Sequence, residues 1–291
     1  RRPTPISDCV APSNAYLGVF LPYTPLHHLL FELGNFPALV MTSGNVSEEP
    51  IAIDNHEAVR RLGGLADHFL VHNRDILLRC DDSVVRPAEG GARQLRRSRG
   101  YVPVPVFLDE ELPPVLAAGG ELKNTICLAR GNQAFLSQHV GDLENLETLR
   151  SFEHTIEHLR QILEVKPECI VHDLHPDYLS TQWADQQSGQ PRLAVQHHHA
   201  HIASCMADNG LDNRRLSGLS FDDPGYGTDG ALWGGEILLA SYSDFERFGH
   251  LESALPRQPD VAQDQVGLLV PCQRERRLAV ARGKDPVSRP L

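Results

Sequence analysis

The order of the apolar segments along the chain predicts an α/β protein made of two parts. In the first part, residues 1–108, short strand-like runs alternate with two helical patterns and with turns rich in Pro and Gly. In the second part, residues 115–255, three strand-like runs are followed by helix, strand, helix, strand and helix, and a further strand begins at residue 216. Residues 109–114, Asp-Glu-Glu-Leu-Pro-Pro, have a composition typical of a linker, so we place the boundary between the parts there.

Local signals in the first part predict two helices and several short strands. Pro25 suits the first turn of a helix, because its missing N–H has no partner to lose at that position. Asp54 and Glu57 form a capping-box pattern before a helix at 55–62, which ends at Gly63-Gly64. Short strands are predicted at 38–41, 68–71, 76–78 and 83–86.

Periodicity in the second part predicts the classes of its elements. The pattern at 147–164 indicates a helix, and Gly131-Asn132 between strands at 125–130 and 134–140 predicts a hairpin. The helix carries one apolar stripe, formed by Leu149, Phe152, Ile156, Leu159 and Leu163. The other predicted elements are strands at 115–118, 169–172, 193–196, 216–221 and 237–241 and helices at 177–187 and 197–209. This order is typical of the ribonuclease-H-like half of actin/Hsp70-type ATPases, whose two halves hold nucleotide between them.

The composition excludes some classes of function. The net charge of −11 argues against a surface attracted as a whole to nucleic acid. There is no run of about eighteen apolar residues and no apolar signal segment, so neither a membrane span nor secretion is expected. The six cysteines are scattered without a CxxC pair, which favours reduced thiols in a cytoplasm. Because the chain does not start with Met, we expect it to be a fragment or a processed product.

Four of the fifteen histidines fall within residues 197–201, at the start of a predicted helix. On a helix, His197 and His201 lie one turn apart and share a face, so the two imidazoles can bind a single metal ion. A zincin-type motif would have Glu after the first His, and that general base is absent here. The alternative is a polar, solvated start of a helix, and the spacing alone does not choose between the two. Cys205 lies one turn further along and can be a third ligand, although a small buried side chain is favoured.

Three other stretches have the residue types that bind phosphate groups. The loop at 42–47 offers backbone N–H groups and short side chains, and Arg96, Arg97 and Arg99 lie beside Ser98 and Gly100. An ordinary turn and a charged edge strand are the respective alternatives. The Gly-rich turn at 222–230 lies between two strands, where backbone N–H groups can approach phosphates closely. Gly119-Gly120 with Lys123-Asn124 stands at the matching place of the preceding half.

Residues 12–105 resemble the C-terminal part of a YrdC-type domain. The runs that carry the resemblance are PSNAYLGVFLPYTPLHHLLF, TSGNVSEEPI, DHFLVHNRDILLRCDDSVVR and RRSRGYVP. These sequences are most similar to those of the HypF family of hydrogenase-maturation carbamoyltransferases. The resemblance implies that ATP and an acyl adenylate are held by Ser43, Asn45, Ser83, Arg97 and Arg99. It also implies that further domains, and the first half of this ATP pocket, precede the chain.

The second part resembles the Kae-type domain of the same family. The matching runs are AAGGELKNT, LSQHVGDLEN, HDLHPDYLST, VQHHHAHIAS and GYGTDGALWGGE. The resemblance implies that His197 and His201 bind a metal, zinc or iron, together with an Asp beyond this chain. It places seven residues at the nucleotide phosphates: Lys123, Asn124, Asp222, Gly225, Gly227, Asp229 and Gly230. Asp223-Pro224 replaces the family's Gly-Thr, which puts phosphate contact at that turn in question because Pro lacks a backbone donor.

The resemblance implies an ATP-dependent carbamoyltransferase. In the family, carbamoyl phosphate and ATP with Mg yield a carbamoyl adenylate, and the carbamoyl group passes to the C-terminal Cys of HypE for cyanide ligands of the NiFe centre. His139, His172 and His175 are candidates for substrate contacts, although ordinary polar contacts are favoured. Two other hypotheses remain: a non-catalytic remnant, and a tRNA threonylcarbamoyl-transfer enzyme, which shares both domain types. Residues 256–291 lack aromatic residues and a clear period, so we expect a disordered or aberrant tail.

Overall fold

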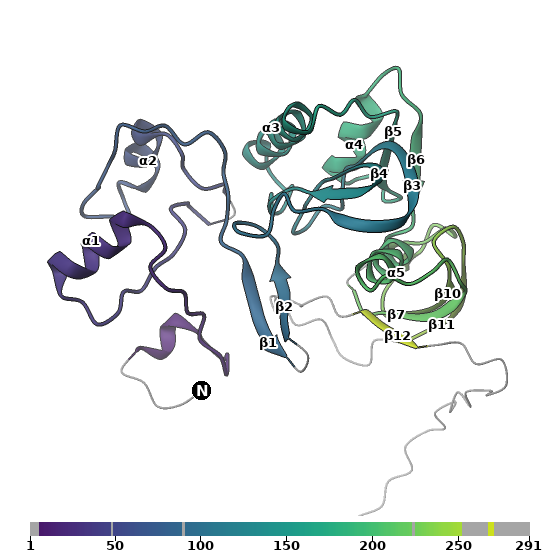
Figure 1. Cartoon of the computed structure of the whole chain (residues 1–291), viewed down its shortest axis with the longest axis horizontal. Helices are drawn as coiled ribbons and strands as arrows, with labels where there is room; N and C mark the ends of the chain where they lie inside the picture. The colour runs from purple at the N-terminus through teal and green to yellow at the C-terminus, as the bar shows by residue number, and fades with distance from the viewer. Residues whose placement is uncertain (1–5, 48, 89–90, 223–224, 252–266, 271–291) are drawn as a thin grey trace, which may run out of the picture. The chain divides into compact units, whose positions relative to one another are not determined.

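A computed structural model of the chain describes residues 6–47, 49–88, 91–222, 225–251 and 267–270. The chain forms two compact units, Arg1–Gly44 and Asn45–Leu291. Figure 1 shows the elements in chain order, from the helix α1 near the N-terminus to the strand β12. The boundary that the composition suggests, at 109–114, lies inside the second unit.

The first unit contains the short 3₁₀ helix η1 (Asp8–Val10) and the helix α1 (Pro25–Gly34). Pro25 opens α1 as predicted, and the Thr24 hydroxyl accepts a hydrogen bond from the His27 N–H at 3.2 Å. The strand expected at 38–41 does not form. A strand needs a hydrogen-bonded neighbour, and the described residues of this unit contain no other strand.

The segment before residue 106 contributes a helix and a hairpin to the second unit. The helix α2 (Asn55–Leu62) has the predicted bounds, with Asp54 accepting from the Glu57 N–H at 2.8 Å and Gly63 at its end. Strand β1 (Val84–Ala88) pairs antiparallel with β2 (Gly91–Arg96), close to the strand predicted at 83–86. The predictions of strands at 68–71 and 76–78 are wrong, because those residues have irregular backbone and form no β-pairing with another segment.

A four-stranded sheet in the order β4-β3-β5-β6 forms the centre of the predicted ribonuclease-H-like half. Its strands are β3 (Val106–Ala117), β4 (Cys127–Leu136), β5 (Cys169–Asp173) and β6 (Arg192–Val195). Strand β3 pairs antiparallel with β4 and parallel with β5, and β5 pairs parallel with β6. The connecting helices are α3 (Leu146–Leu163) and α4 (Leu179–Gln186), and α5 (His197–Asp208) follows β6.

Two predictions about this sheet are wrong. Residues 109–114, expected as a linker, lie within β3, where the register shifts against β4 on either side of Leu112. The hairpin expected at Gly131-Asn132 is instead one continuous strand, β4, so the sheet has two strands before α3 and not three. Gly131 has φ of +54° and lies opposite Leu112 at the irregular part of the register. Gly131 therefore marks a β-bulge in the pairing of β4 with β3. Glycine within a strand often marks such a bulge.

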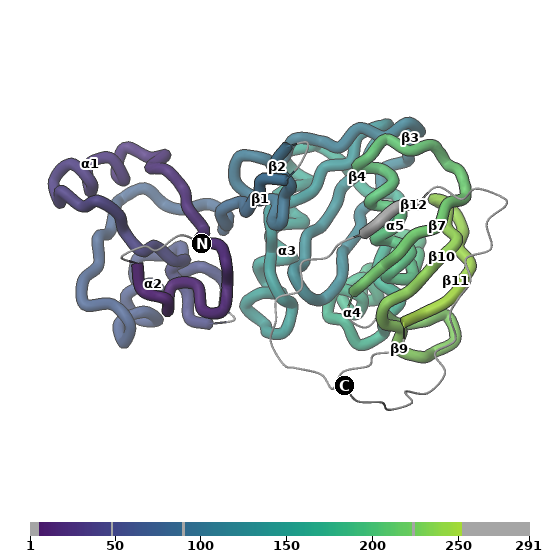
Figure 2. The backbone as a smooth tube through the Cα atoms, turned by 90° about the horizontal axis from the view of Figure 1, so that it is seen from below, coloured from purple at the N-terminus to yellow at the C-terminus, as the bar shows by residue number. Residues whose placement is uncertain are grey.

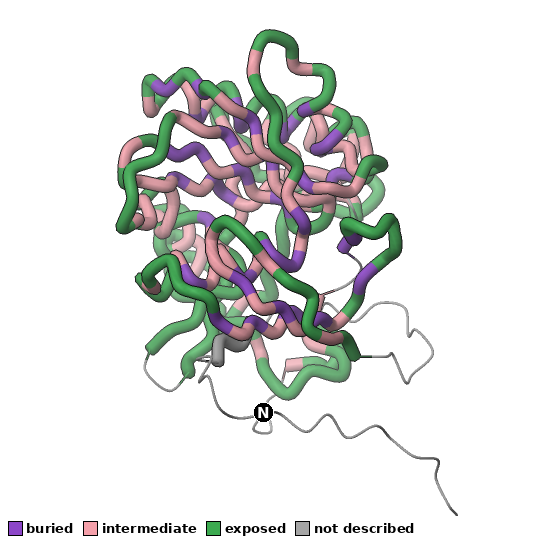
Figure 3. The backbone as a smooth tube through the Cα atoms, turned by 90° about the vertical axis from the view of Figure 1, so that its right-hand side faces the viewer, coloured by how far each residue is buried: buried purple, intermediate pink, exposed green. Residues whose placement is uncertain are grey.

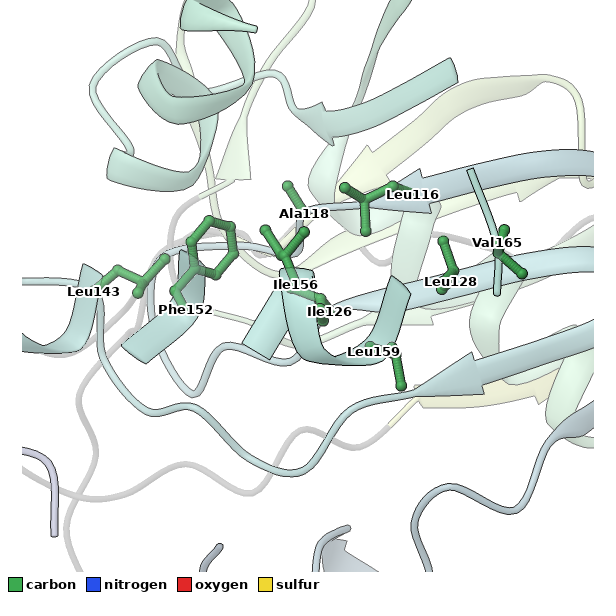
Figure 4. Close-up of a cluster of buried hydrophobic side chains, with 9 residues drawn as sticks. All are labelled: Leu116, Ala118, Ile126, Leu128, Leu143, Phe152, Ile156, Leu159 and Val165. Carbon is green, nitrogen blue, oxygen red and sulfur yellow. The ribbon is translucent and has the colours of Figure 1, made fainter. Parts of the chain in front are cut away.

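The apolar stripe predicted for the long helix packs on this sheet. Phe152, Ile156 and Leu159 of α3 are buried against Leu116 of β3 and Leu128 of β4, as Figure 4 shows. Leu149 and Leu163 pack against the same cluster, half-buried, and Phe152 meets Trp183 of α4 edge-to-face with ring centroids 5.3 Å apart. The predicted helix and its core face are confirmed.

A second sheet, in the order β11-β10-β7-β12, follows α5. Its strands are β7 (Leu216–Ser220), β10 (Glu236–Ala240), β11 (Phe245–His250) and β12 (Gly267–Val270). All neighbouring strands in this sheet are antiparallel. The short strands β8 (Gly225–Tyr226) and β9 (Leu232–Trp233) form a separate antiparallel pair. Buried and half-buried residues alternate along β7 and β10. Figure 3 shows several stretches of the chain where buried and half-buried residues alternate in this way. One face of this sheet is therefore covered.

Helix α5 covers that face, and Figures 1 and 2 both show it beside β7 and β10. Ile202 and Met206 of α5 pack with Leu216 and Leu238 in a second core cluster. Gly218 makes this approach possible, because a Cβ at that position would lie 2.4 Å from Ile202 Cδ1. Helix α5 thus starts at the edge of the first sheet and packs on the second.

The tail expected at 256–291 is described only at 267–270. These residues form β12, which pairs with β7, so this part of the expectation of disorder is wrong. Residues 252–266 and 271–291, and the Asp223-Pro224 departure, lie outside the described residues.

Candidate metal centre

The first turn of α5 distributes its histidines between two faces. The Gln196 side chain caps the helix by accepting a hydrogen bond from the His199 N–H at 2.9 Å. His199 Nε2 lies 2.8 Å from the Ser241 carbonyl oxygen, on the side of the second sheet. His197 and His201 share the other side, with Nε2 atoms 3.1 Å apart. The four-residue spacing therefore brings these two imidazoles together, as predicted.

Asp222 completes a cluster with the two histidines. It follows β7, and its Oδ2 lies 3.0 Å from His197 Nε2 and 2.7 Å from His201 Nε2. One ligand atom from each of the three residues lies within 4.8 Å of the others, a geometry that could hold a metal ion. The resemblance placed Asp222 among residues at the nucleotide phosphates. The structure puts its carboxylate against the histidine pair, and its predicted role at the phosphates stays a prediction.

The cluster couples a cationic imidazole to carboxylates. Burial by itself lowers the pKa of His197, but hydrogen bonds to Asp173 and Asp222 outweigh burial and raise the pKa to about 9. Burial raises the pKa of Asp222, but the hydrogen bonds from His197 and His201 outweigh burial and hold that pKa well below its ordinary value. A bound cation would take the place of the imidazolium proton between these groups.

Sequence reasoning missed Asp173, which lies behind His197. Its Oδ2 is 2.5 Å from His197 Nδ1, and its side chain is 5% exposed. Asp173 ends β5 and is paired with Val195 at the end of β6, two residues before His197. An acidic residue at the carboxyl end of a buried parallel strand was the available signal, since ligand sites of open α/β sheets gather at that edge.

The loop at 119–124 lies directly beside this cluster. A Cβ on Gly120 would lie 3.3 Å from His197 Cε1, so the loop backbone packs on the imidazole. The buried Asn124 amide donates to the carbonyl oxygens of Ala118 at 2.9 Å and Gly120 at 2.7 Å. The Lys123 N–H donates to Asp142 Oδ1 at 2.6 Å, and Lys123 has φ of +49°. Asn124 thus shapes the loop through its own backbone, and the predicted role of both residues at a phosphate stays a prediction.

The Gly-rich turn has a local structure of its own. Asp229 Oδ1 accepts hydrogen bonds from Trp233 Nε1 at 2.9 Å and from the Ala231 N–H at 3.1 Å. The Ala231 hydrogen bond is the main reason that the pKa of Asp229 is lowered. Gly227 accommodates the Trp233 ring, and Gly230 has φ of +78°. The resemblance gives Asp222 and Asp229 the same role. In the structure, Asp222 contacts the histidine pair, whereas Asp229 contacts Trp233 and Ala231.

Gly225 supports the first turn of α5. A Cβ there would lie 2.7 Å from Cε1 of the fully buried His198 and 3.0 Å from His197 Cβ. We expect Gly225→Ala to lower the free energy of unfolding by about 1–3 kcal/mol, the usual cost of overpacking. Gly234→Ala is the matched control, because a Cβ at Gly234 meets nothing within 4 Å. Urea unfolding followed by circular dichroism measures both, and equal effects would contradict the proposed close contact.

The residues predicted to hold an adenylate in the first part have intramolecular partners. Ser83 Oγ donates to the Arg99 carbonyl oxygen at 2.9 Å and accepts from the Ser98 N–H at 2.8 Å. Arg99 donates to the Cys80 carbonyl oxygen at 2.9 Å, and Arg97 donates to that of Val104 at 2.6 Å. Asn45 donates to the carbonyl oxygens of Val46 and Glu49, both at 3.0 Å. Ser43 belongs to the first unit.

The remaining candidates lie in varied surroundings. His139 Nε2 is 3.9 Å from Asp81 Oδ2, and burial lowers the pKa of His139. His172 Nδ1 lies 2.8 Å from the Asp173 carbonyl oxygen, and His175 stacks on Tyr178 with ring centroids 4.3 Å apart. Cys205 is half-buried on α5, and burial raises the pKa of its thiol. The ligand group that the described residues form comprises His197, His201 and Asp222, without Cys205.

Fold and site define a class of protein: an α/β protein in which a mixed sheet and a second, antiparallel sheet are joined by a helix that carries a two-histidine, one-carboxylate cluster. Three family models match the chain. They are the Sua5/YciO/YrdC model, described as "Telomere recombination", at residues 1–98, the "HypF Kae1-like domain" at 110–208, and the "Carbamoyltransferase, Kae1-like Domain, second subdomain" at 218–265.

Relatives and solved structures agree with these matches. The chain is 48% identical to "Carbamoyltransferase HypF2" of Cupriavidus necator over 85% of this chain and 33% of the relative. It is 47% identical to "Carbamoyltransferase HypF" of a Synechocystis species over 84% of this chain and 32% of that relative. The crystal structure of T. kodakarensis HypF superposes with a TM-score of 0.79 at 42% identity, covering 86% of this chain and 33% of that one.

A crystal structure of full-length HypF "in the phosphate- and nucleotide-bound form" has a TM-score of 0.75 at 50% identity, covering 79% of this chain and 36% of that one. The chain belongs to the HypF family of carbamoyltransferases. It spans about one third of the length of the relatives that it matches. Among the described residues, no helix is long and apolar enough to cross a membrane.

Proposed function

We propose that this chain is the part of a hydrogenase-maturation carbamoyltransferase that binds the metal ion of the transfer site. The observation that carries the proposal is the convergence of His197, His201 and Asp222 on one point beside the Gly120 loop. Its supporting context is the membership of the chain in the HypF family, whose relatives are named carbamoyltransferases. The whole protein would use carbamoyl phosphate and ATP and deliver the carbamoyl group to the C-terminal Cys of a HypE-type acceptor protein.

The residues of the cluster fit a divalent transition metal. Two imidazole nitrogens and one carboxylate oxygen are ligands that suit zinc or iron, and these three ligands leave coordination positions for substrate and for the further Asp that the resemblance implies. When bound, the metal would supply Lewis acidity toward a carbamoyl oxygen or orient a nucleotide. The side chains of His197 and Asp222 are only 18% and 12% exposed.

ATP with Mg is the second cofactor of the proposal. Backbone groups of the loop at 119–124 lie next to the cluster, which supports a nucleotide there, with Lys123 and Asn124 beside its phosphates. In the proposed reaction, water hydrolyses carbamoyl phosphate to carbamate and inorganic phosphate, a carbamate oxygen attacks the α-phosphorus of ATP, and pyrophosphate leaves. The acceptor thiol then forms a bond to the carbamoyl carbon, the bond to the adenylate oxygen breaks, AMP leaves, and the thiol proton passes to solvent. The cysteine is supplied by the acceptor, so the chain needs no nucleophile of its own.

A reducing cytoplasm suits this chemistry, since the acceptor thiol has to stay reduced. The five cysteines in the described part of the chain are free, which supports the same compartment.

Pyrophosphate release tests the proposed reaction. The whole protein that contains this chain would be incubated with ATP, Mg and Zn²⁺, with either carbamoyl phosphate or threonine plus bicarbonate as the second substrate. Release that depends on carbamoyl phosphate, and label from ¹⁴C-carbamoyl phosphate on a peptide ending in Cys, are the expected results. Release with threonine and bicarbonate alone would favour a tRNA threonylcarbamoyl-transfer enzyme. No release with either would overturn the proposal for this chain and favour a non-catalytic remnant.

A further inference from the structure

Asp173 is a buried carboxylate with both oxygens in use. Its Oδ2 lies 2.5 Å from His197 Nδ1, the ring nitrogen that faces away from the proposed metal. Its Oδ1 accepts a hydrogen bond from the His175 N–H at 2.9 Å. Burying a carboxylate costs free energy unless hydrogen bonds satisfy its oxygens, and here both oxygens have a partner.

The backbone on either side of Asp173 is held from several directions. The Leu174 N–H donates to the Val195 carbonyl oxygen at 3.0 Å, and Thr181 Oγ1 donates to the Asp173 carbonyl oxygen at 3.1 Å. The parallel register of β5 on β6 pairs Asp173 with Val195. A Cβ on Gly120 would lie 4.0 Å from Asp173 Oδ2, so the Gly120 loop covers the carboxylate and the imidazole together. The position of the carboxylate is therefore set before any metal binds.

The hydrogen bond has a direct consequence for His197. A carboxylate accepts, so Nδ1 carries the proton, and the lone pair of the neutral ring is then on Nε2. Nε2 is the atom that faces His201 Nε2 and Asp222 Oδ2. His201 also directs its Nε2 toward this point, where it lies near His197 Nε2 and Asp222 Oδ2.

We propose that Asp173 is a positioning residue, which fixes the tautomer and ring orientation of His197 so that Nε2 is presented to the metal. The inference rests on the proposed metal site and adds a residue that the resemblance does not assign. Outer-shell partners of this kind commonly raise metal affinity by ten- to a hundredfold.

The isosteric variant Asp173→Asn separates positioning from a structural role. An amide has one acceptor and one donor group in place of two acceptors. With its oxygen on the His175 N–H, its NH₂ group would face His197 Nδ1 and require the tautomer that protonates Nε2. With the oxygen on His197, the NH₂ group would face the His175 N–H, and two donors would meet. Asp177→Asn is the matched control, since Asp177 is an exposed acid on the same segment and loses the same charge.

The experiment is Zn²⁺ affinity of the full chain by competition with a chromophoric chelator, with the d–d spectrum of the Co²⁺ form as the second readout. We expect Asp173→Asn to weaken Zn²⁺ binding by ten- to a hundredfold and to alter the Co²⁺ spectrum, while Asp177→Asn stays within about twofold of wild type. In the zinc-loaded wild type, the His197 Nδ1 proton should give a protected downfield resonance, which Asp173→Asn should lose.

Unchanged affinity and an unchanged Co²⁺ spectrum in Asp173→Asn, with metal binding lost in His197→Ala, would overturn the inference and leave the metal site in place. Metal retained in His197→Ala would instead overturn the metal site itself. A thermal melt of each metal-free variant shows whether the fold is kept. If Asp173→Asn does not fold, Asp173→Glu provides the second test, with partial recovery of affinity expected from the retained carboxylate.

Discussion

Asp222→Ala is expected to weaken Zn²⁺ binding by roughly a thousandfold or more, because loss of a ligand exceeds the ten- to hundredfold cost of losing an outer-shell partner. Asp222 contributes the carboxylate oxygen that lies within hydrogen-bond distance of both imidazole Nε2 atoms. Its removal leaves two histidines, which cannot by themselves close a three-ligand site. Chelator competition at fixed pH measures the affinity, and elemental analysis of the purified protein gives the metal content.

Asp229→Ala is the control for this prediction. Both acids belong to the Gly-rich turn, and the resemblance gives both the same role at the nucleotide phosphates. Asp229 is instead bonded to Trp233 and Ala231, so its removal should lower stability slightly and leave Zn²⁺ affinity within about twofold. Equal losses of affinity in the two variants would show that the turn acts as a single phosphate- or metal-binding unit, contrary to the structure.

Raising the pH from 6.5 to above 9 is expected to destabilise the metal-free protein by up to about 3 kcal/mol. The pKa of His197 is 6.5 in the unfolded chain and about 9 in the folded protein, and one pKa unit corresponds to about 1.36 kcal/mol. Because the folded pKa is the higher one, this stabilisation is complete below pH 6.5 and is lost as the pH rises through 9. The pKa of Asp222 is lowered in the folded protein, so its contribution is present above its ordinary value of 3.8 and is lost as the pH falls.

Urea unfolding of EDTA-treated protein between pH 4 and pH 10 measures this profile. His197→Gln is the control variant, because it keeps a polar side chain of similar reach but removes the titrating group. The alkaline loss of stability should flatten in that variant. An alkaline limb of the same slope in both proteins would show that the ion pairs of His197 with Asp173 and Asp222 do not stabilise the fold.

The sequence by itself determined the elements whose signals are short in range. The helix α2 has its predicted bounds because Asp54 and Glu57 satisfy its first turn locally. The stripe on α3 identified a core face because the helical period places Phe152, Ile156 and Leu159 on one side. The pairing of His197 with His201 is local in the same way, since residues four apart on a helix are neighbours.

The tertiary structure decided what depends on pairing between distant segments. Whether Gly131 makes a turn or a bulge is set by the register of β4 on β3, and apolar runs such as 38–41 become strands only where a partner exists. Asp173 and Asp222 lie 24 and 25 residues from His197 in sequence, so no local period relates them. The parallel pairing of β5 with β6 and the packing of α5 on β7 bring the two carboxylates to opposite nitrogens of one imidazole. Hydrogen-bond register and core packing act over these distances, which is why the histidines were found from sequence and the acids around them were placed by the fold.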